Sequence, residues 1–111
     1  MAARFAYQHP DMIDGLVLWA AYPASSDDLS NQSLKVVSIV GSQDGLGTGD
    51  GVEATRQLLP LGTQFIDIKG GNHAQFGWYG EQPGDANAAI TRTEQQKMVL
   101  QATLELLAGL E

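Results

Sequence analysis

QFIDIKGGNHAQFGWYG, residues 64–80, is the stretch on which the interpretation of the whole sequence depends. It joins a short strand-like segment to a loop that opens with two glycines, and His73, one of the chain's two histidines, lies just beyond them. An imidazole titrates near neutral pH, so it can accept a proton and return it within one turnover. A histidine just past the end of a strand is therefore a candidate general base. The simpler alternative is an exposed loop histidine without a role.

A carboxylate occupies the same kind of position after an earlier strand. In VVSIVGSQDGLG, residues 36–47, Asp44 follows an apolar run and precedes a glycine. In open parallel sheets the working residues gather at the carboxyl ends of the strands. Loops from adjacent strands can bring an Asp carboxylate to an imidazole N–H, which fixes the tautomer and leaves the other ring nitrogen as the base. We therefore expect Asp44 and His73 to form a pair. The alternative for Asp44 is a residue of an Asp-Gly turn.

Three segments have the composition of strands. GLVLWAA, residues 15–21, is a continuous apolar run, typical of a strand buried on both faces of a parallel sheet, and this pattern places Trp19 in the core. KVVSIV, residues 35–40, is a second buried strand. QFIDI, residues 64–68, alternates more between apolar and polar, and Asp67 favours a position near the edge of the sheet.

Helical segments alternate with these strands. Residues 1–8 have helical composition but no capping residue ahead of them. A second helix, capped by Asp50 with Glu53, is expected to bury Val52, Thr55 and Leu59 and to end around Pro60. TRTE, residues Thr91–Glu94, is a capping box for a helix that runs to about Leu107 and stops at Gly109. This alternation predicts an α/β fold with about three parallel strands flanked by helices.

Length and composition exclude several classes of protein. The 111 residues predict one domain over residues 1–111, and 6 basic against 13 acidic side chains give a net charge of −7. No basic run is present to neutralise phosphates, which argues against nucleic acid or an anionic membrane as a partner. The absence of cysteine excludes disulfides and thiolate chemistry. With no leader and no apolar run near the length of a membrane span, we expect a soluble, cytoplasmic protein.

No cofactor is expected. The glycine-rich segment GLGTGDG, residues 45–51, tempts a phosphate-loop interpretation, but Asp50 stands where the G-x-G-x-x-G spacing requires a glycine. His9 and His73 do not form a spaced pair of metal ligands, and no cysteine cluster exists.

Three segments, in this order and spacing, resemble the C-terminal half of an α/β-hydrolase, and the likeness covers nearly the whole chain. They are YQHPDMIDGLVLWAAYPA (7–24), VVSIVGSQDGL (36–46) and KGGNHAQFGWYG (69–80). In that family the triad follows the order nucleophile, acid, histidine. The resemblance implies that Asp44 is the acid and His73 the histidine.

The third segment is most similar to the small-esterase or dienelactone-hydrolase-like branch, which implies a small ester or lactone as substrate. Trp78 and Tyr79, beside the histidine, are candidates for lining the substrate pocket, although packing against the final helix would explain them equally well.

The sequence departs from the family pattern at the nucleophile. No G-x-S-x-G is present, and MAARFAYQ, residues 1–8, resembles the helix that follows this elbow in the family. We therefore expect a truncated hydrolase that carries the acid and the histidine but not the serine, and that is inactive alone. Recruitment of another hydroxyl, Ser42 being the nearest in sequence to Asp44, is a less favoured alternative.

A second class of function stays open, in which the chain is a non-catalytic, self-associating remnant or interaction module. In the family, the strand that corresponds to GLVLWAA has a neighbour on each side, and here one neighbour is missing. An apolar strand with an unpaired edge is an association site because its N–H and C=O groups need partners. We expect a homodimer joined through the edge of Leu16 to Ala20.

Overall fold

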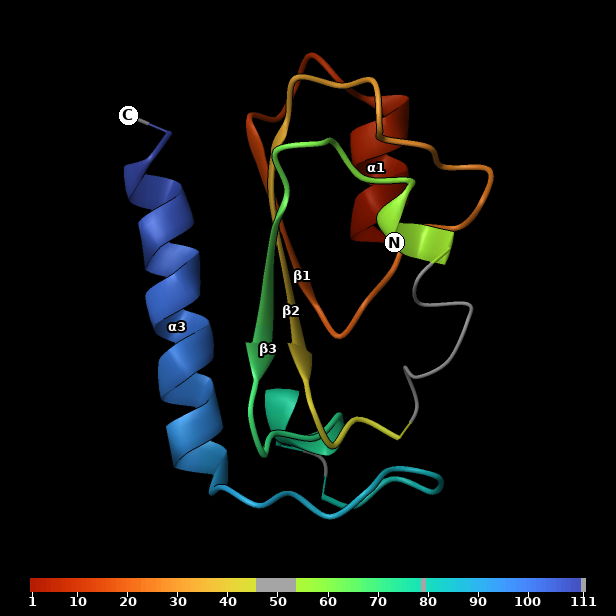
Figure 1. Ribbon diagram of the computed structural model, residues 1–111. Helices are drawn as coiled ribbons and strands as arrows, with labels where there is room; N and C mark the ends of the chain where they lie inside the picture. Colours follow the sequence, from red (N-terminus) through yellow and green to blue (C-terminus); the bar gives the residue numbers. More distant parts are fainter. Residues whose placement is uncertain (46–53, 79, 111) are drawn as a thin grey trace.

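A three-stranded parallel sheet lies between helices on its two faces (Figure 1). The computed structural model describes residues 1–45, 54–78 and 80–110. The elements are α1 (Ala2–Gln8), β1 (Gly15–Trp19), β2 (Lys35–Gly41), β3 (Gln64–Ile68), the 3₁₀ helix η1 (Ala74–Phe76) and α3 (Arg92–Ala108). The predicted α/β class, with three parallel strands flanked by helices, is confirmed.

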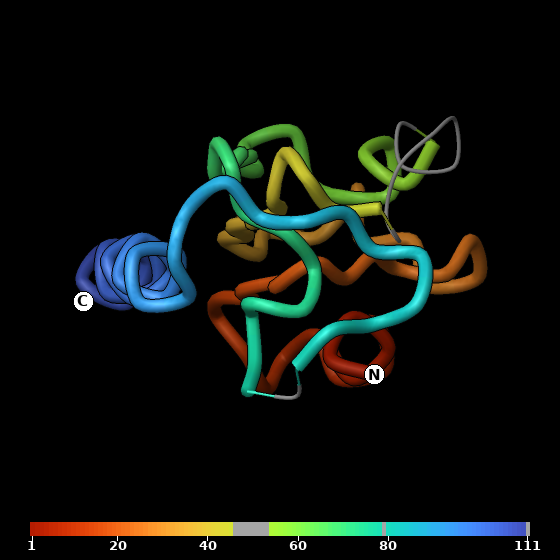
Figure 2. Tube along the Cα trace, turned by 90° about the horizontal axis from the view of Figure 1, so that it is seen from below, coloured from red at the N-terminus to blue at the C-terminus, as the bar shows by residue number. Residues whose placement is uncertain are grey.

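The strands are ordered β1-β2-β3, so β2 is central and β3 forms one edge, as Asp67 indicated. Both pairings are parallel, and the register aligns Leu18 with Ser38 and Ser38 with Phe65. All three strands therefore end at the same side of the sheet. Figure 2 shows the molecule from that side, where residues 80–91 cross in front of the strand ends.

The side chains of the sheet divide into two core layers because successive residues of a strand point to opposite faces. One layer contains α1, alternate residues of β1 and Val36 of β2. The other contains Val37 and Ile39 of β2 together with Val99 and Ala102 of α3. The central strand is thus buried on both faces, which explains the apolar run of residues 35–40.

Strand β1 departs from the expectation of burial on both faces. Leu16 and Leu18 are buried under α1, but Val17 is only half-buried. The side chain of Trp19 is 49% exposed, so its predicted place in the core is wrong. Trp19 ends the strand and, together with residues of η1, the histidine loop and the first half of α3, lines an open groove.

The helices follow the sequence signals closely. Helix α1 begins after Met1 without a side-chain cap and buries only Ala3 and Ala6. Helix α3 begins as the capping box predicted, because the Thr91 hydroxyl accepts a hydrogen bond from the Glu94 N–H at 3.1 Å. It ends at Gly109. None of the helices in the described part of the chain combines the length and the apolar character that a membrane crossing requires.

The helix expected to end around Pro60 is described only from residue 54. Residues 54–56 are helical and lead into a turn. Leu59 is buried as predicted, Thr55 is only half-buried, and Val52 lies outside the described residues. The predicted capping residues of the helix, Asp50 and Glu53, also lie outside the described residues.

Gly41 allows the end of β2 to lie close to Gly71 in the loop after β3. A Cβ atom on Gly41, the last residue of β2, would fall against the backbone carbonyl of Gly71 and within 2.9 Å of the Asn72 nitrogen. Backbone atoms cannot move aside as a flexible side chain can, so residue 41 must be glycine for the histidine loop to keep its position.

We predict that Gly41→Ala lowers the free energy of unfolding by about 1–3 kcal/mol, the usual cost of forcing an extra methyl into a packed site. Urea denaturation measures this difference. Gly62→Ala is the matched control, because a Cβ there meets nothing within 4 Å. Equal stability of the two variants would show that the loops are not packed as described.

Candidate active site

The candidate site lies where the loops after β2 and β3 meet. Backbone hydrogen bonds hold these loops together: the Ser42 N–H donates to Ile68 O at 3.0 Å, and the Gln43 N–H donates to Gly71 O at 2.7 Å. The Ser42 hydroxyl accepts a hydrogen bond from the Gly70 N–H at 2.8 Å. Asp44 and His73 follow directly on these linked segments, which is why they come together.

Asp44 and His73 are in hydrogen-bond contact, as the sequence predicted. Asp44 Oδ2 lies 3.0 Å from His73 Nδ1, and the side chains are 2% and 29% exposed respectively. A carboxylate can only accept, so Nδ1 donates and the neutral ring carries its proton there. This tautomer leaves Nε2 as the acceptor, and the partial exposure of the ring makes it accessible to a reacting group.

A buried glutamine of α3 fixes the backbone of the histidine loop. Gln95 is fully buried; its Oε1 accepts from the Asn72 N–H at 3.1 Å, and its Nε2 donates to Asn72 O at 2.8 Å. Gln95 therefore satisfies both backbone groups of the residue before His73. Gly71 makes room for it, because a Cβ there would lie 2.8 Å from Gln95 Oε1.

Asn72 extends this network with its own side chain. Its Oδ1 accepts from the Gln75 N–H at 3.0 Å, and its Nδ2 donates to Ala86 O at 2.9 Å. Neither Asn72 nor Gln95 was predicted as part of the site from the sequence. The available signal was Gln95 itself, because a glutamine four residues before Val99 falls on the buried stripe of the helix, where a polar side chain needs partners.

Asp85 caps the 3₁₀ helix that begins after His73. Its carboxylate accepts from the His73 N–H at 3.2 Å and from the Ala74 N–H at 2.9 Å. Burial works to raise the pKa of Asp85, but the N–H donors of Ala74, Gly45 and His73 outweigh it and hold the pKa below its ordinary value. Asp85 is therefore ionised at neutral pH.

Trp78 lies on the histidine loop beside α3, and its side chain is 74% exposed. The Arg92 guanidinium lies 4.8 Å from the centre of its ring, so Trp78 packs on the first residue of the final helix. It also lines an apolar groove of about 680 Å³ with Trp19 and Phe76. The other pocket candidate, Tyr79, lies outside the described residues.

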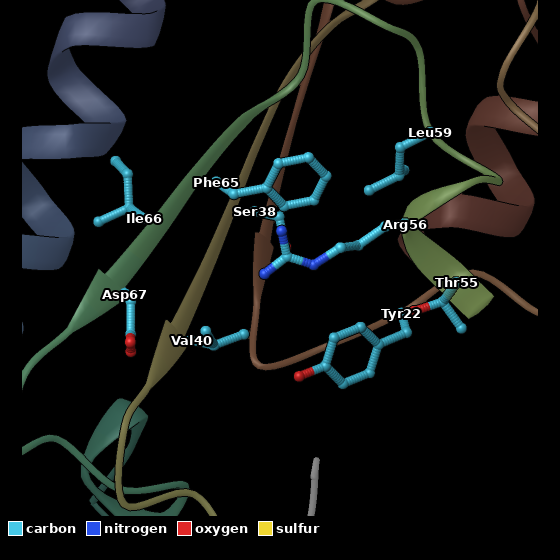
Figure 3. A pocket seen from close by; sticks show the side chains of 9 residues that line it. All are labelled: Tyr22, Ser38, Val40, Thr55, Arg56, Leu59, Phe65, Ile66 and Asp67. Atoms are coloured by element: carbon cyan, nitrogen blue, oxygen red, sulfur yellow. The ribbon is translucent and has the colours of Figure 1, made fainter. Parts of the chain in front are cut away.

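A second, smaller pocket of about 180 Å³ lies on the sheet face away from α3 (Figure 3). In it the Arg56 guanidinium lies over the ring of Phe65, 4.5 Å from the ring centre. Burial raises the pKa of Tyr22, and the negative charge of Asp44 raises it further. The positive charge of Arg56 opposes part of this increase. Tyr22 is therefore a neutral phenol close enough to Asp44 to sense its charge.

The described residues contain no set of side chains that could bind a metal ion. No three His, Asp or Glu side chains of residues 1–45, 54–78 and 80–110 gather where they could hold a metal ion. The chemistry that the site itself offers is proton transfer by an imidazole whose tautomer is set by a carboxylate.

We predict that Gln95→Leu lowers the free energy of unfolding by about 1–3 kcal/mol, because it leaves the buried N–H and C=O of Asn72 without their partner. Gln101→Leu is the control on the same helix, since Gln101 is exposed and we expect a change within about 0.5 kcal/mol. Denaturant titration compares them, and equal effects would contradict the buried network.

One of the comparisons with known proteins identified a family. The model of the alpha/beta hydrolase family matches residues 1–97, which include both members of the Asp44–His73 pair. Searches of curated proteins and of solved structures found no significant match. With a family match over most of its length and a parallel α/β sheet, this chain belongs to the alpha/beta hydrolase family.

Proposed function

We propose that the chain carries the acid and the base of a serine-hydrolase triad that acts on a small ester or lactone. His73 is the general base, and Asp44 is the carboxylate that orients it. The observation that carries the proposal is the 3.0 Å contact between a buried carboxylate and a partly exposed imidazole at the carboxyl ends of neighbouring parallel strands. In this arrangement Nε2 takes the proton of an attacking hydroxyl and later returns it to the leaving group.

The nucleophile of this triad is proposed to lie outside these 111 residues. Within them no G-x-S-x-G occurs. Ser42, the nearest candidate by sequence, uses its hydroxyl as an acceptor for the Gly70 N–H, which supports a structural role in joining the two loops. Ser38 is buried in the middle of the central strand. The chain alone is therefore expected to be inactive.

The groove beside the histidine loop is the proposed place for the apolar part of the substrate. Trp78, Trp19 and Phe76 give it an aromatic wall, and its volume of about 680 Å³ is in the range of small-molecule sites. Tyr79 remains a candidate contact by its sequence position alone.

Incubation with a fluorophosphonate followed by intact-mass measurement tests this function, because the reagent labels an activated serine. We expect no stoichiometric adduct, and hydrolysis of a short p-nitrophenyl ester no faster than that of His73→Ala, because the base has no serine to activate. His9→Gln is the control for the second histidine, which lies away from the pair.

An adduct that disappears in both His73→Ala and Asp44→Ala would show that the chain holds its own nucleophile, and the absence of a serine would be refuted. Retention of the adduct in Ser42→Ala would then place the nucleophile elsewhere in the chain. An adduct that persists in His73→Ala would refute the role of His73 as base.

A second candidate function, self-association, is favoured by the free side of β1. Only β2 pairs with β1 among the described strands. The Ala20 N–H donates to Ile39 O of β2, and because alternate residues of a strand bond to the same neighbour, Val17 and Trp19 direct their backbone groups away from β2. A second copy adding its own Leu16–Ala20 edge would satisfy these groups and cover Trp19.

We predict that the chain is a dimer at micromolar concentration by light scattering and that Trp19→Lys shifts it towards monomer, because a charge on an edge strand opposes pairing. Leu61→Lys, at a fully exposed position ahead of β3, is the control and leaves the mass unchanged. A monomeric wild-type chain would contradict this candidate without affecting the proposed acid–base pair.

A further inference from the structure

We propose that Asp85 is a positioning residue whose carboxylate ties the loop carrying Asp44 to the loop carrying His73 and so keeps the pair in contact. The inference rests on the proposed function, in which these two residues work together. It assigns to Asp85 a role that extends beyond capping the short helix η1.

The hydrogen bonds of Asp85 reach the residues next to both members of the pair. Its Oδ1 accepts from the Gly45 N–H at 3.1 Å and from the His73 N–H at 3.2 Å. Its Oδ2 accepts from the Ala74 N–H at 2.9 Å. Gly45 directly follows Asp44, so a single carboxylate contacts the backbone on both sides of the Asp44–His73 contact. A residue that only capped η1 would have no need of Gly45.

Packing at Gly45 supports the same link independently. A Cβ atom on Gly45 would fall against the carbonyl oxygen of Gly84 and within 3.0 Å of the Ala86 nitrogen. The loop that carries Asp44 therefore contacts the backbone of residues 84–86 directly. Asn72, the neighbour of His73, reaches this segment too, by donating to Ala86 O at 2.9 Å. The 84–86 segment thus contacts both loops by two kinds of interaction.

The chemistry of the three donors explains why this residue is an aspartate. Three N–H groups converge on it, and an ionised carboxylate offers two oxygens with room for all three. An asparagine has one acceptor oxygen, so it must give up either the Ala74 contact or the shared contact to Gly45 and His73. The lowered pKa of Asp85 agrees with a carboxylate that is stabilised in its charged form.

The tautomer ratio of His73 distinguishes positioning of the pair from general stabilisation. If Asp85 only stabilised the fold, replacing it would leave this ratio unchanged. Long-range ¹H–¹⁵N correlation spectra of the imidazole ring, recorded at alkaline pH, show which nitrogen carries the proton. His9→Gln assigns the signals of the two histidines. The samples are wild type, Asp85→Asn, Asp44→Ala and Asp28→Asn. Asp28 is the matched control, an aspartate that accepts the Ser30 N–H at 2.9 Å in another loop.

We expect the Nδ1–H form to dominate in the wild type and in Asp28→Asn, and to lose its preference in Asp44→Ala. In Asp85→Asn the ratio of the Nδ1–H to the Nε2–H form should fall roughly fivefold, as expected from weakening one hydrogen bond. A wild-type ratio in Asp85→Asn, with the preference lost in Asp44→Ala, would overturn the role of Asp85 and leave the proposed function standing. An unchanged ratio in Asp44→Ala would overturn the pair itself.

Hydrogen exchange in the wild-type chain keeps the inference testable if Asp85→Asn does not fold. The amides of Gly45 and Ala74 are expected to be protected well beyond that of Leu61, an exposed position outside the network. Exchange of the Gly45 amide as fast as that of Leu61, in a folded chain, would overturn the link between the two loops.

Discussion

The close approach of the carboxyl ends of β2 and β3 is the constraint on which the site depends. Parallel pairing brings the two strands to the same side of the sheet, and Gly41 lets the histidine loop pack directly on the end of β2. The acid–base pair depends on this contact. Backbone hydrogen bonds from Ser42 to Ile68, the last residue of β3, and from Gln43 to Gly71 bring the segments that carry Asp44 and His73 side by side.

The side chains of a buried glutamine and a partly exposed aspartate then convert this backbone contact into a fixed geometry. Gln95 holds the residue before His73 from the side of α3, and Asp85 accepts from the N–H groups of His73 and of Ala74, the first residue of η1. Polar networks in a low-dielectric interior are stable only when their members are satisfied, and here donors and acceptors are closely matched. The backbone is therefore fixed on both sides of His73, at Asn72 and at Ala74, while part of the imidazole ring stays exposed.

Local signals were sufficient to predict the fold and the pair. Strand composition placed Asp44 and His73 after neighbouring strands, and the capping box set the start of α3. The supporting residues were not predictable in the same way, because the partners of Gln95 and Asp85 lie more than ten residues away and depend on how the loops meet. Trp19 was misplaced because an apolar run indicates a strand but does not say whether a helix covers its end.

The loops that carry the acid–base pair differ in character from the outer side of β1. The loops at the carboxyl ends are closed by hydrogen bonds, whereas the outer side of β1 and the neighbouring surface of α3 leave large apolar side chains exposed, among them Trp19, Leu100 and Leu104. Exposed apolar surface of this kind marks a place of interaction. Both proposed functions need such a surface, one for a substrate and one for a second copy.

The central claim is that Asp44 and His73 are energetically coupled, and a double-mutant cycle measures this most directly. Unfolding free energies of the wild type, Asp44→Ala, His73→Ala and the double variant, taken at about pH 6 where an imidazole is partly charged, isolate the pairwise term. A coupling of about 1–3 kcal/mol is predicted for a charge-assisted hydrogen bond with one buried partner. Additive single effects, with no coupling, would contradict the account.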